Sequence, residues 1–416
     1  MPSPPIEARI RAFYLYEMLV SFQLWSPFWA LWLFQHANPF QATLVDIVFW
    51  IVSLLVTMPA GAIADRYGRK PALIVGISIW ILGIVLFGLA NSIVVFSVAN
   101  GIWAFGAAFT WGTGAAFLYD TLAEAGQESR YPRIMSRVTM FTFLATAIAA
   151  GLGGFLVFRT NAFNLPLLVY AIPGVGALAV VATFREPAVH RMPAANLIAQ
   201  IRAGLRTTRR DRQIVLVIVF QVLISIVTYV MAFFRPAYIE GIVAGNSLLI
   251  GLAYGGFFCV AALGGLSIGR ILDRRGETGA LWLTFALVFP PFLVVYAVTL
   301  GIFPDSIGTT VGILAQAPYY LIWGFEGPIV YTIINRRVES SDRATVLAIQ
   351  SFATTLALAV FEPVVGLLVT WYGIGLGLVL LAAAAVVPSG GVVVAYARAA
   401  PRLAGPVPVG SPDRSR

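Results

Sequence analysis

The sequence predicts an all-α membrane protein of twelve transmembrane helices in two pseudo-symmetric six-helix bundles, with both chain termini on the cytoplasmic side. Three observations predict this fold. First, 59% of the residues are hydrophobic and 11% are charged, whereas soluble proteins contain about 25% charged residues. Second, twelve apolar runs are each long enough to cross a bilayer, which takes about 20 residues. Third, the positive charges gather on one side of these runs.

The twelve apolar runs are separated by turn-like or charged segments such as HANPFQ, RYGRKP and RTNAFN, which end helices. The runs lack the in–out alternation of a membrane β-barrel. When the N-terminus is placed inside, all 27 Lys and Arg residues except Arg159 and Arg235 fall on the inner side. This asymmetry sets the orientation. The predicted spans are residues 13–34, 44–63, 72–90, 93–119, 134–157, 163–184, 214–236, 247–269, 280–300, 309–333, 345–370 and 374–397.

The expected domain organisation is a six-helix bundle over 1–184, a linker over 185–213, a second bundle over 214–397 and a tail over 398–416. In the linker, Leu197, Ile198, Ile201 and Leu205 recur at helical spacing among arginines. This pattern predicts an amphipathic helix on the anionic inner leaflet, with a docking site for a partner as the alternative. The tail is rich in Pro, Gly and Arg and is expected to be disordered.

A loop motif occurs twice in the chain. GAIADRYG at 61–68 is repeated as GRILDRRG at 269–276, and both copies follow the second span of their half. GGFLV at 153–157 similarly matches VGLLV at 365–369. The repeats indicate two halves in the same orientation, and parallel halves with a substrate site between them are typical of transporters.

The first copy, extended to GAIADRYGRK at 61–70, resembles the signature loop of the major facilitator superfamily, G-x-x-x-D-[RK]-x-G-R-[RK]. The resemblance covers nearly the whole chain through span number and orientation. It implies a secondary transporter working by alternating access, in a poorly characterised bacterial branch similar to drug-efflux members. The fourth span carries no arginine and the fifth no Gly-Pro pair, although drug/proton antiporters of the family often have both.

The same resemblance implies gating residues in the first loop. It places Asp65 against the N-terminus of the eleventh helix, near 341–343, where partial positive charge favours a carboxylate. Gly61, one turn earlier, would permit close helix approach. Arg69 would bridge Asp65 to Asp120, so that the cluster holds the inner faces of the two halves together. The alternative is that these charges serve only as a topology signal.

In the second loop, Asp273 is expected to act as a weaker pseudo-symmetric partner of Asp65. It would meet the arginine-rich region 130–137, at the start of the fifth span. The partnership should be weaker because Arg69 and Lys70 have no counterparts after Gly276.

Ionisable groups inside spans mark substrate or proton paths by default, because they are costly there. Glu17, Asp46, Glu326 and Glu362 are such groups. A carboxyl group buried in an apolar environment can bind and release a proton near neutral pH. The alternatives are that Glu17 reaches the inner interface, that Asp46 reaches outer water, and that Glu362 bonds to a neighbouring helix beside Pro363.

Aromatic side chains accompany these carboxyl groups, and Trp323 lies one turn before Glu326. An aromatic cavity with few carboxylates suits amphipathic or cationic compounds through burial and cation–π contact. Near the outer end of the seventh span, Arg235 could pair with Glu240 as an outer gate or could bind an anionic substrate.

The function expected is proton-coupled efflux of amphipathic or cationic organic compounds through the bacterial cytoplasmic membrane. The alternatives are a proton-coupled importer or facilitator of a small organic solute, and a non-transporting membrane sensor. One cysteine and two distant histidines predict neither a disulfide framework nor a metal site. No cofactor, nucleic-acid partner or enzyme activity is predicted, and there is no phosphate-binding G-x-x-x-x-G-K-[ST] loop. The expected partners are a small molecule, protons and lipid, with a functional monomer.

Overall fold

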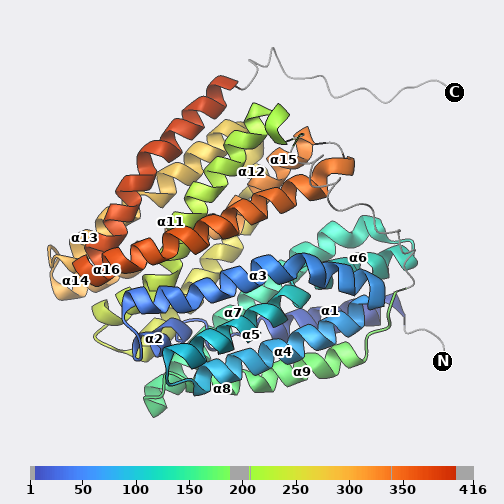
Figure 1. Cartoon of the computed structure of the whole chain (residues 1–416), viewed down its shortest axis with the longest axis horizontal. Coiled ribbons are helices and arrows are strands. Elements are labelled where there is room, and N and C mark those ends of the chain that lie inside the picture. The colour runs from blue at the N-terminus through green and yellow to red at the C-terminus, as the bar shows by residue number, and fades with distance from the viewer. Residues whose placement is uncertain (1–4, 188–205, 207, 339, 400–416) are drawn as a thin grey trace.

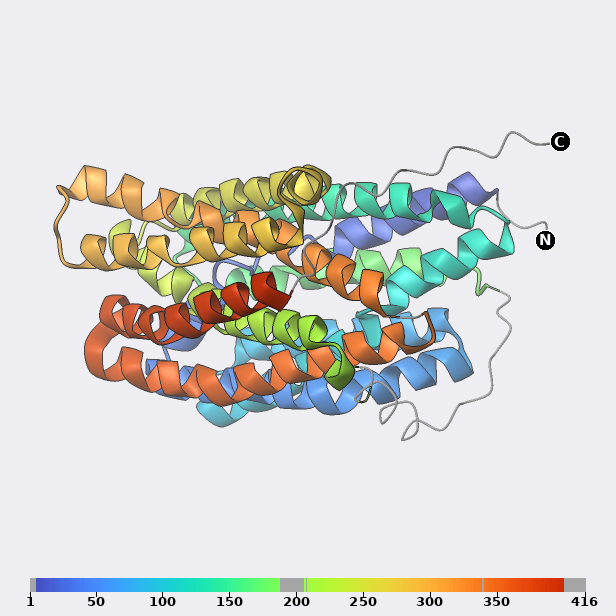
Figure 2. The ribbon, with the colours of Figure 1, turned by 90° about the horizontal axis from the view of Figure 1, so that it is seen from above.

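The computed structural model describes residues 5–187, 206, 208–338 and 340–399, and in these ranges the regular structure is helical. Figures 1 and 2 show elongated helices running roughly along one axis. The first half contains α1 (Ile6–Val20), α2 (Trp29–Phe34), α3 (Pro39–Tyr67), α4 (Arg69–Leu89), α5 (Ile93–Thr110), α6 (Thr113–Glu124), η1 (Glu128–Arg130), α7 (Tyr131–Thr160), α8 (Leu165–Val169) and α9 (Ala171–Ala182). The second half contains α11 (Arg212–Ile242), α12 (Ser247–Val288), α13 (Pro290–Thr299), α14 (Asp305–Leu314), α15 (Ala317–Arg337) and α16 (Ser340–Ala399).

These helices account for the twelve predicted spans. Within the described residues, eight helical stretches are long and apolar enough to cross a membrane. Two of the eight, 247–299 and 345–399, reverse direction at Gly276 and Gly373, whose φ angles of 63° and 79° interrupt the helix. Each of these stretches therefore supplies two spans. The first and tenth spans are the helix pairs α1–α2 and α14–α15.

Five predicted spans are each divided between two helices, and the sixth and ninth divide at Tyr170 and Phe289. The first span stops at Val20 and resumes at Trp29. The fourth breaks between α5 and α6 at Gly112, whose φ is 78°. The tenth breaks between α14 and α15 at Ala315 and Gln316. Irregular backbone at membrane depth is tolerated where protein buries it or where it lines a cavity.

Helix starts follow local capping chemistry. Asn38 accepts a hydrogen bond from the Gln41 N–H while the Gln41 side chain accepts from the Asn38 N–H, forming a capping box before α3. The Asp211 side chain caps α11 by accepting from the N–H groups of Gln213 and Ile214, and the Asn246 side chain caps α12 by accepting from the Leu249 N–H. Such caps satisfy N–H groups that the first helical turn leaves free.

The two halves touch mainly at their outer ends, meaning the ends opposite the start of α1. There the Phe40 N–H of α3 donates to the Thr370 hydroxyl of α16 at 3.0 Å, and the Phe34 ring of α2 stacks on Phe234 of α11 at 5.8 Å. Towards the inner ends, α3 and α16 diverge (Figure 1). The described structure is therefore closed at the outer end and splayed at the inner end.

A second contact between the halves joins α7 to α12 through glycines. A Cβ atom on Gly154 would lie 2.7 Å from the Cα of Gly251, and one on Gly251 would lie 2.5 Å from the Ala150 carbonyl. Only glycine allows this approach, because real Cβ atoms do not come that close to backbone. Small residues at helix interfaces allow such packing in membranes.

Part of the expected linker and tail lies outside the described residues. This applies to the predicted amphipathic helix at Leu197, Ile198, Ile201 and Leu205, and to the chain from 400 onward. The domain boundaries stay a prediction.

Candidate functional site

The first loop forms a cluster that we name the N-terminal inner clamp, defined by Asp65, Arg69, Asp120 and Glu186. Arg69 Nη1 lies 3.2 Å from Asp65 Oδ1, and Arg69 Nε lies 2.5 Å from Asp120 Oδ2. The described structure thus places Arg69 between the two carboxylates suggested by the sequence. These contacts join α3, α4 and α6 within one half and do not link the two halves to each other.

Glu186 was missed by the sequence reasoning. Its carboxylate accepts the N–H of Arg69 at 2.6 Å and the N–H of Lys70 at 2.7 Å. It therefore caps the N-terminus of α4, where a negative charge is favourable. Gly68 makes room for this cap, because a Cβ atom there would lie 2.9 Å from Glu186 Oε1. An acidic residue straight after the sixth span was the available signal, but no spacing rule ties it to the loop.

One expected gating contact, the close helix approach at Gly61, is not made among the described residues. Gly61 has open space around its Cα, with no atom within 4 Å of a Cβ built there, so no helix approaches closely at this point. The Asp65 side chain is 67% exposed. Its expected neighbours at 341–343 have side chains outside the described set. Both observations agree with inner ends that stand apart.

The second loop also forms a cluster, which we name the C-terminal inner clamp and define by Gln213, Glu277, Arg337 and Tyr396. Arg337 Nη2 donates to Glu277 Oε2 at 2.5 Å, and the Tyr396 hydroxyl donates to the same oxygen at 2.6 Å. Arg337 Nε donates to Gln213 Oε1 at 3.1 Å. Burial raises the pKa of Glu277, but the hydrogen bonds from Arg337 and Tyr396 outweigh it and lower that pKa from its ordinary value.

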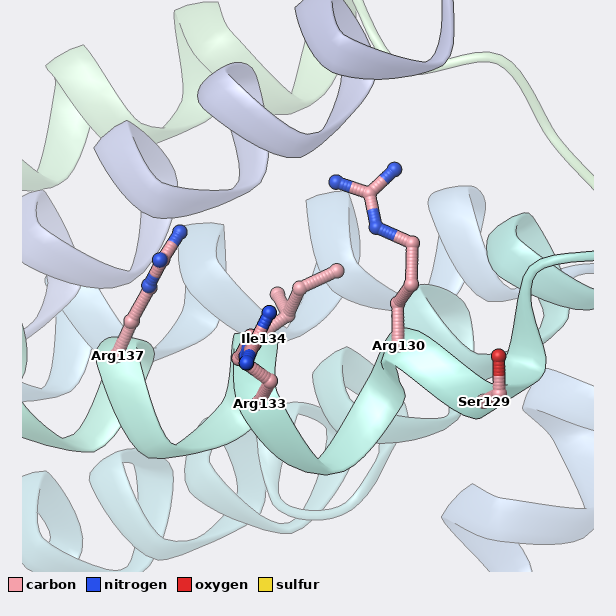
Figure 3. Close-up of a pocket in the computed structure, with 5 residues that line it drawn as sticks. All are labelled: Ser129, Arg130, Arg133, Ile134 and Arg137. Carbon is pink, nitrogen blue, oxygen red and sulfur yellow. The ribbon is translucent and has the colours of Figure 1, made fainter.

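Asp273, the expected centre of the second loop, is exposed, and the described residues give it no ion pair. A separate pocket of about 330 Å³ is lined by the arginines expected to meet Asp273, namely Arg130 of η1 and Arg133 and Arg137 of α7 (Figure 3). Arg130 instead donates to Glu7 of α1 at 2.8 Å. The expected pairing of Asp273 with region 130–137 is therefore absent from this arrangement.

Asp46 and Glu362 meet at the closed outer interface, in a group that we name the carboxyl pair. Asp46 is 3% exposed and Glu362 is 0% exposed, so the alternative that Asp46 reaches outer water is wrong for this arrangement. The Tyr229 hydroxyl donates to Asp46 Oδ2 at 2.9 Å, and the Trp50 indole N–H donates to Glu362 Oε2 at 3.1 Å. The structure therefore brings together two candidates that lie far apart in the sequence.

Glu326 and Glu17 lie in different halves. Glu326 on α15 is 8% exposed, and its Oε1 is buried with no hydrogen-bond partner among the described residues. Trp323, one turn earlier on the same helix, is 59% exposed. The centroid of its ring lies 6.4 Å from that of the Phe143 ring in the other half. Glu17 is half-buried on α1, and a Cβ atom on Gly114 of α6 would lie 3.0 Å from its Oε1.

Arg235 does not form the expected ion pair with Glu240. It is 3% exposed, and its Nε donates to Gln316 Oε1 at 3.2 Å. Its guanidinium lies 4.6 Å from the Tyr320 ring centroid and 5.7 Å from that of Tyr319. Arg235 is thus a buried cation stabilised by an amide and two aromatic rings.

The arrangement of these helices agrees with the protein family that the sequence matches. The model of the Major Facilitator Superfamily matches residues 15–361, which is most of the chain. The chain belongs to the Major Facilitator Superfamily. It is therefore a multi-pass integral membrane protein of a transporter family and not an enzyme, and the fold expected from the sequence is confirmed.

Curated relatives match a shorter part of the chain. The multidrug resistance protein Stp of Mycobacterium tuberculosis (strain CDC 1551 / Oshkosh) is 34% identical over 118 residues, which are 27% of this chain and 21% of Stp. The multidrug resistance protein MdtL of Vibrio parahaemolyticus serotype O3:K6 is 32% identical over 119 residues, 29% of this chain and 28% of MdtL. The chain therefore matches less than a third of either relative.

Solved structures match over nearly the whole chain, at identities that show the fold alone. A mutant form of the nucleoside transporter NupG superposes with a TM-score of 0.78 at 13% identity, covering 95% of this chain and 100% of NupG. A bacterial homologue of the human lysosomal transporter Spinster, inward-facing and unoccupied, gives 0.70 at 14% identity, with 95% and 98% covered. The inward-open xylose transporter XylE of E. coli gives 0.68 at 13%, with 93% and 95% covered.

Proposed function

We propose that the protein exports amphipathic or cationic organic compounds across the bacterial cytoplasmic membrane in exchange for protons, as a functional monomer. Alternating access follows from the family. The direction, the class of substrate and the coupling to protons are our inference, supported by the matched segments of multidrug resistance proteins.

The observation that carries the proposal is the setting of Glu326. A buried carboxyl oxygen without a hydrogen-bond donor is energetically unfavourable, so a structural role alone gives no reason for it. The exposed Trp323 ring lies one turn away on the same helix. A carboxyl group next to an aromatic face can hold either a proton or an organic cation, since the ring face attracts cations. Competition between the two for one site is the simplest basis for exchange.

Glu17 offers a second proton site in the other half. The missing side chain at Gly114 leaves space against α6 for its carboxyl group. The fourth span carries no arginine, and the space beside Gly114 on that span holds a carboxyl group from the first span. This placement supports a role of Glu17 in proton transfer towards the inner end.

The test is transport in proteoliposomes with an imposed pH gradient, using a fluorescent organic cation such as ethidium and a pH-sensitive dye inside. We expect the pH-sensitive dye to report proton movement driven by the cation. The rate of this movement should fall at least tenfold in Glu326→Gln. Glu240→Gln is the matched control, because that half-buried carboxyl group lies at the outer end of α11. Intact coupled transport in both Glu326→Gln and Glu17→Gln would contradict the proposal.

The buried Arg235 supports a second candidate, proton-coupled uptake of a small anionic organic solute. A guanidinium that is 3% exposed and without a carboxylate partner among the described residues can recognise an anion. The same liposomes with the gradient reversed test this alternative, using a panel of small organic anions. Uptake that is lost in Arg235→Gln and unaffected in Glu326→Gln would favour the importer.

A further inference from the structure

The carboxyl pair connects the two halves through hydrogen bonds that cross in both directions. Tyr229 of the second half donates to Asp46 of the first half, and Trp50 of the first half donates to Glu362 of the second. The Trp50 and Tyr229 rings also pack edge to face at 4.6 Å. The four side chains therefore form one network, which parts if the outer ends of α3 and α16 separate.

The two carboxyl groups lie within hydrogen-bonding reach of each other. Both are buried. Glu362 Oε1 has no hydrogen-bond donor among the described residues when both groups are counted as acceptors. A proton carried by one of the two groups supplies the missing donor and joins them.

Among the described residues, the groups that act on the carboxyl pair include no positive charge that could replace that proton. The groups that act on Asp46 are Glu362, Tyr229 of α11, Asn100 of α5 and Trp50 of its own helix. Those that act on Glu362 are Asp46 and Trp50. Apart from the pair itself, these neighbours are uncharged donors. Two adjacent carboxyl groups in such a site cannot both ionise, because like charges repel strongly where water is absent.

We propose that Asp46 and Glu362 form a proton-operated outer gate, in which one shared proton holds the outer ends of the two halves together. When the proton leaves, two adjacent carboxylates repel each other across the interface, and the outer ends part to admit water. Acid on the outer side therefore favours the closed outer end, and alkaline conditions favour its opening.

This gate deepens the proposed function and rests on its alternating access, since it assigns a proton to the step that closes the outer end. It does not require that the same proton exchange with substrate. Glu17 and Glu326 lie outside the network, so a fault in their role leaves the gate intact.

The test measures the distance between two spin labels across the outer interface by electron–electron double resonance. Cys259 is first replaced by alanine, and cysteines are placed at Gln35 and Tyr372, which are exposed. The expected result for the parent protein is a short distance at pH 5 and a growing long-distance population up to pH 9. No dependence on pH in this range would overturn the proposal.

Variants separate the gate from a general effect of pH. Glu362→Gln cannot ionise, so its long-distance population at pH 9 should fall at least tenfold and lose its pH dependence. Asp46→Asn should behave in the same way and serves if Glu362→Gln does not fold. Glu240→Gln, the control in the same half, should retain the parent titration. A parent-like titration in both amide variants would overturn the gate.

The measurement uses no substrate and no gradient, so its outcome is independent of the transport assay. If proton coupling in liposomes is lost while the spin-label titration is normal, the proposed function is contradicted and the gate is not. If the spin-label distances do not depend on pH while coupled transport is intact, the gate is contradicted and the proposed function is not.

Discussion

The N-terminal and C-terminal inner clamps occupy equivalent positions in the two halves. In their central ion pairs the positive and the negative residue have exchanged places. Arg69 directly follows Gly68 and pairs with Asp120 at the inner end of the fourth span. Glu277 directly follows Gly276 and pairs with Arg337 at the inner end of the tenth span. Both glycines adopt positive φ, 109° and 63°. The internal repeat therefore preserved a turn and an ion pair while exchanging the signs of the charges.

The two clamps also differ in the third side chain that contacts each turn. Its chemistry follows the charge of the residue directly after the glycine. Beside Arg69, the partner from the end of the sixth span is the Glu186 carboxylate, which accepts N–H groups. Beside Glu277, the partner from the twelfth span is the Tyr396 hydroxyl, which donates. Glu277 fills the position of Arg69 in the second half with the opposite charge, so Arg69 has no basic counterpart there. Spatial equivalence need not mean identical residues.

Exchanging the two charges of each ion pair should give the largest difference in the free energy of unfolding between the two halves. In Arg69→Glu with Asp120→Arg, the introduced glutamate lies beside the Glu186 carboxylate at the start of α4. We expect a loss of about 3 kcal/mol in the free energy of unfolding, because like charges meet in a partly buried site. In Glu277→Arg with Arg337→Glu, the introduced arginine meets the Tyr396 hydroxyl and Arg336, whose side chain is 59% exposed, so solvent screens the repulsion and this exchange should lose less.

Thermal unfolding in detergent measures both exchanges. Glu186→Gln added to the first exchange should recover part of its loss. Equal losses in the two halves would show that the third contact does not distinguish the clamps.

Removing one partner of each ion pair should lower the stability less than exchanging the charges, and the loss should be larger in the second half. Arg337→Ala leaves the Glu277 carboxylate with Tyr396 and with Arg336 at 3.6 Å, so we expect a loss of about 2 kcal/mol. Asp120→Asn leaves Arg69 with Asp65 at 3.2 Å and should lose about 1 kcal/mol. Urea unfolding followed by tryptophan fluorescence would test the order, and a larger loss for Asp120→Asn would reverse our ranking.

The turn glycines provide a matched pair of substitutions. Gly68→Ala adds a clash with Glu186 at 2.9 Å to the backbone strain, whereas Gly276→Ala meets no atom within 4 Å. Positive φ with extended ψ, 151° at Gly68 and −175° at Gly276, costs an alanine about 1–3 kcal/mol in either position, and the clash at Gly68 adds to this strain. We expect the melting temperature of Gly68→Ala to fall further. Equal melting temperatures would mean that Glu186 moves aside freely.

The smallest expected effect is the pH dependence of the C-terminal inner clamp. The pKa of Glu277 is lowered, so its stabilisation is present above the ordinary value of 4.5 and is lost as the pH falls through the lower value of the folded state. Glu277→Gln should remove this part of the acid sensitivity, by about 1 kcal/mol or less. Unfolding measured from pH 6 to pH 3 checks it, and an unchanged acid limb would contradict the assignment.

Much of the fold could be predicted from the sequence because the bilayer imposes length and polarity on every span. The reversals at Gly276 and Gly373 lay where the apolar runs were interrupted. The break at 21–28 was missed, although Pro27 and the polar residues Ser21, Gln23 and Ser26 offered a local signal for it. Hydropathy records polarity and not conformation.

The site was predictable only where contacts are local in the sequence. Asp65 and Arg69 are four residues apart on the two sides of the turn at Gly68, so their contact is local in the sequence. Asp46 and Glu362 were each recognised as costly charges, but their meeting depends on how α3 and α16 pack. Glu186 was missed for the same reason, since only tertiary structure brings it to α4.

The glycine contact between α7 and α12 has a mechanical consequence. Backbone meets backbone at Gly154 and Gly251, so no interlocking side chains resist a small rotation there, and the contact can serve as a fulcrum. From Gly154 to the inner end of α7 at Tyr131 the helix is about 35 Å long, at about 1.5 Å per residue. Each degree of rocking then moves that inner end by about 0.6 Å. A lever of this length turns a slight adjustment at the outer contact into a wide displacement at the opposite end.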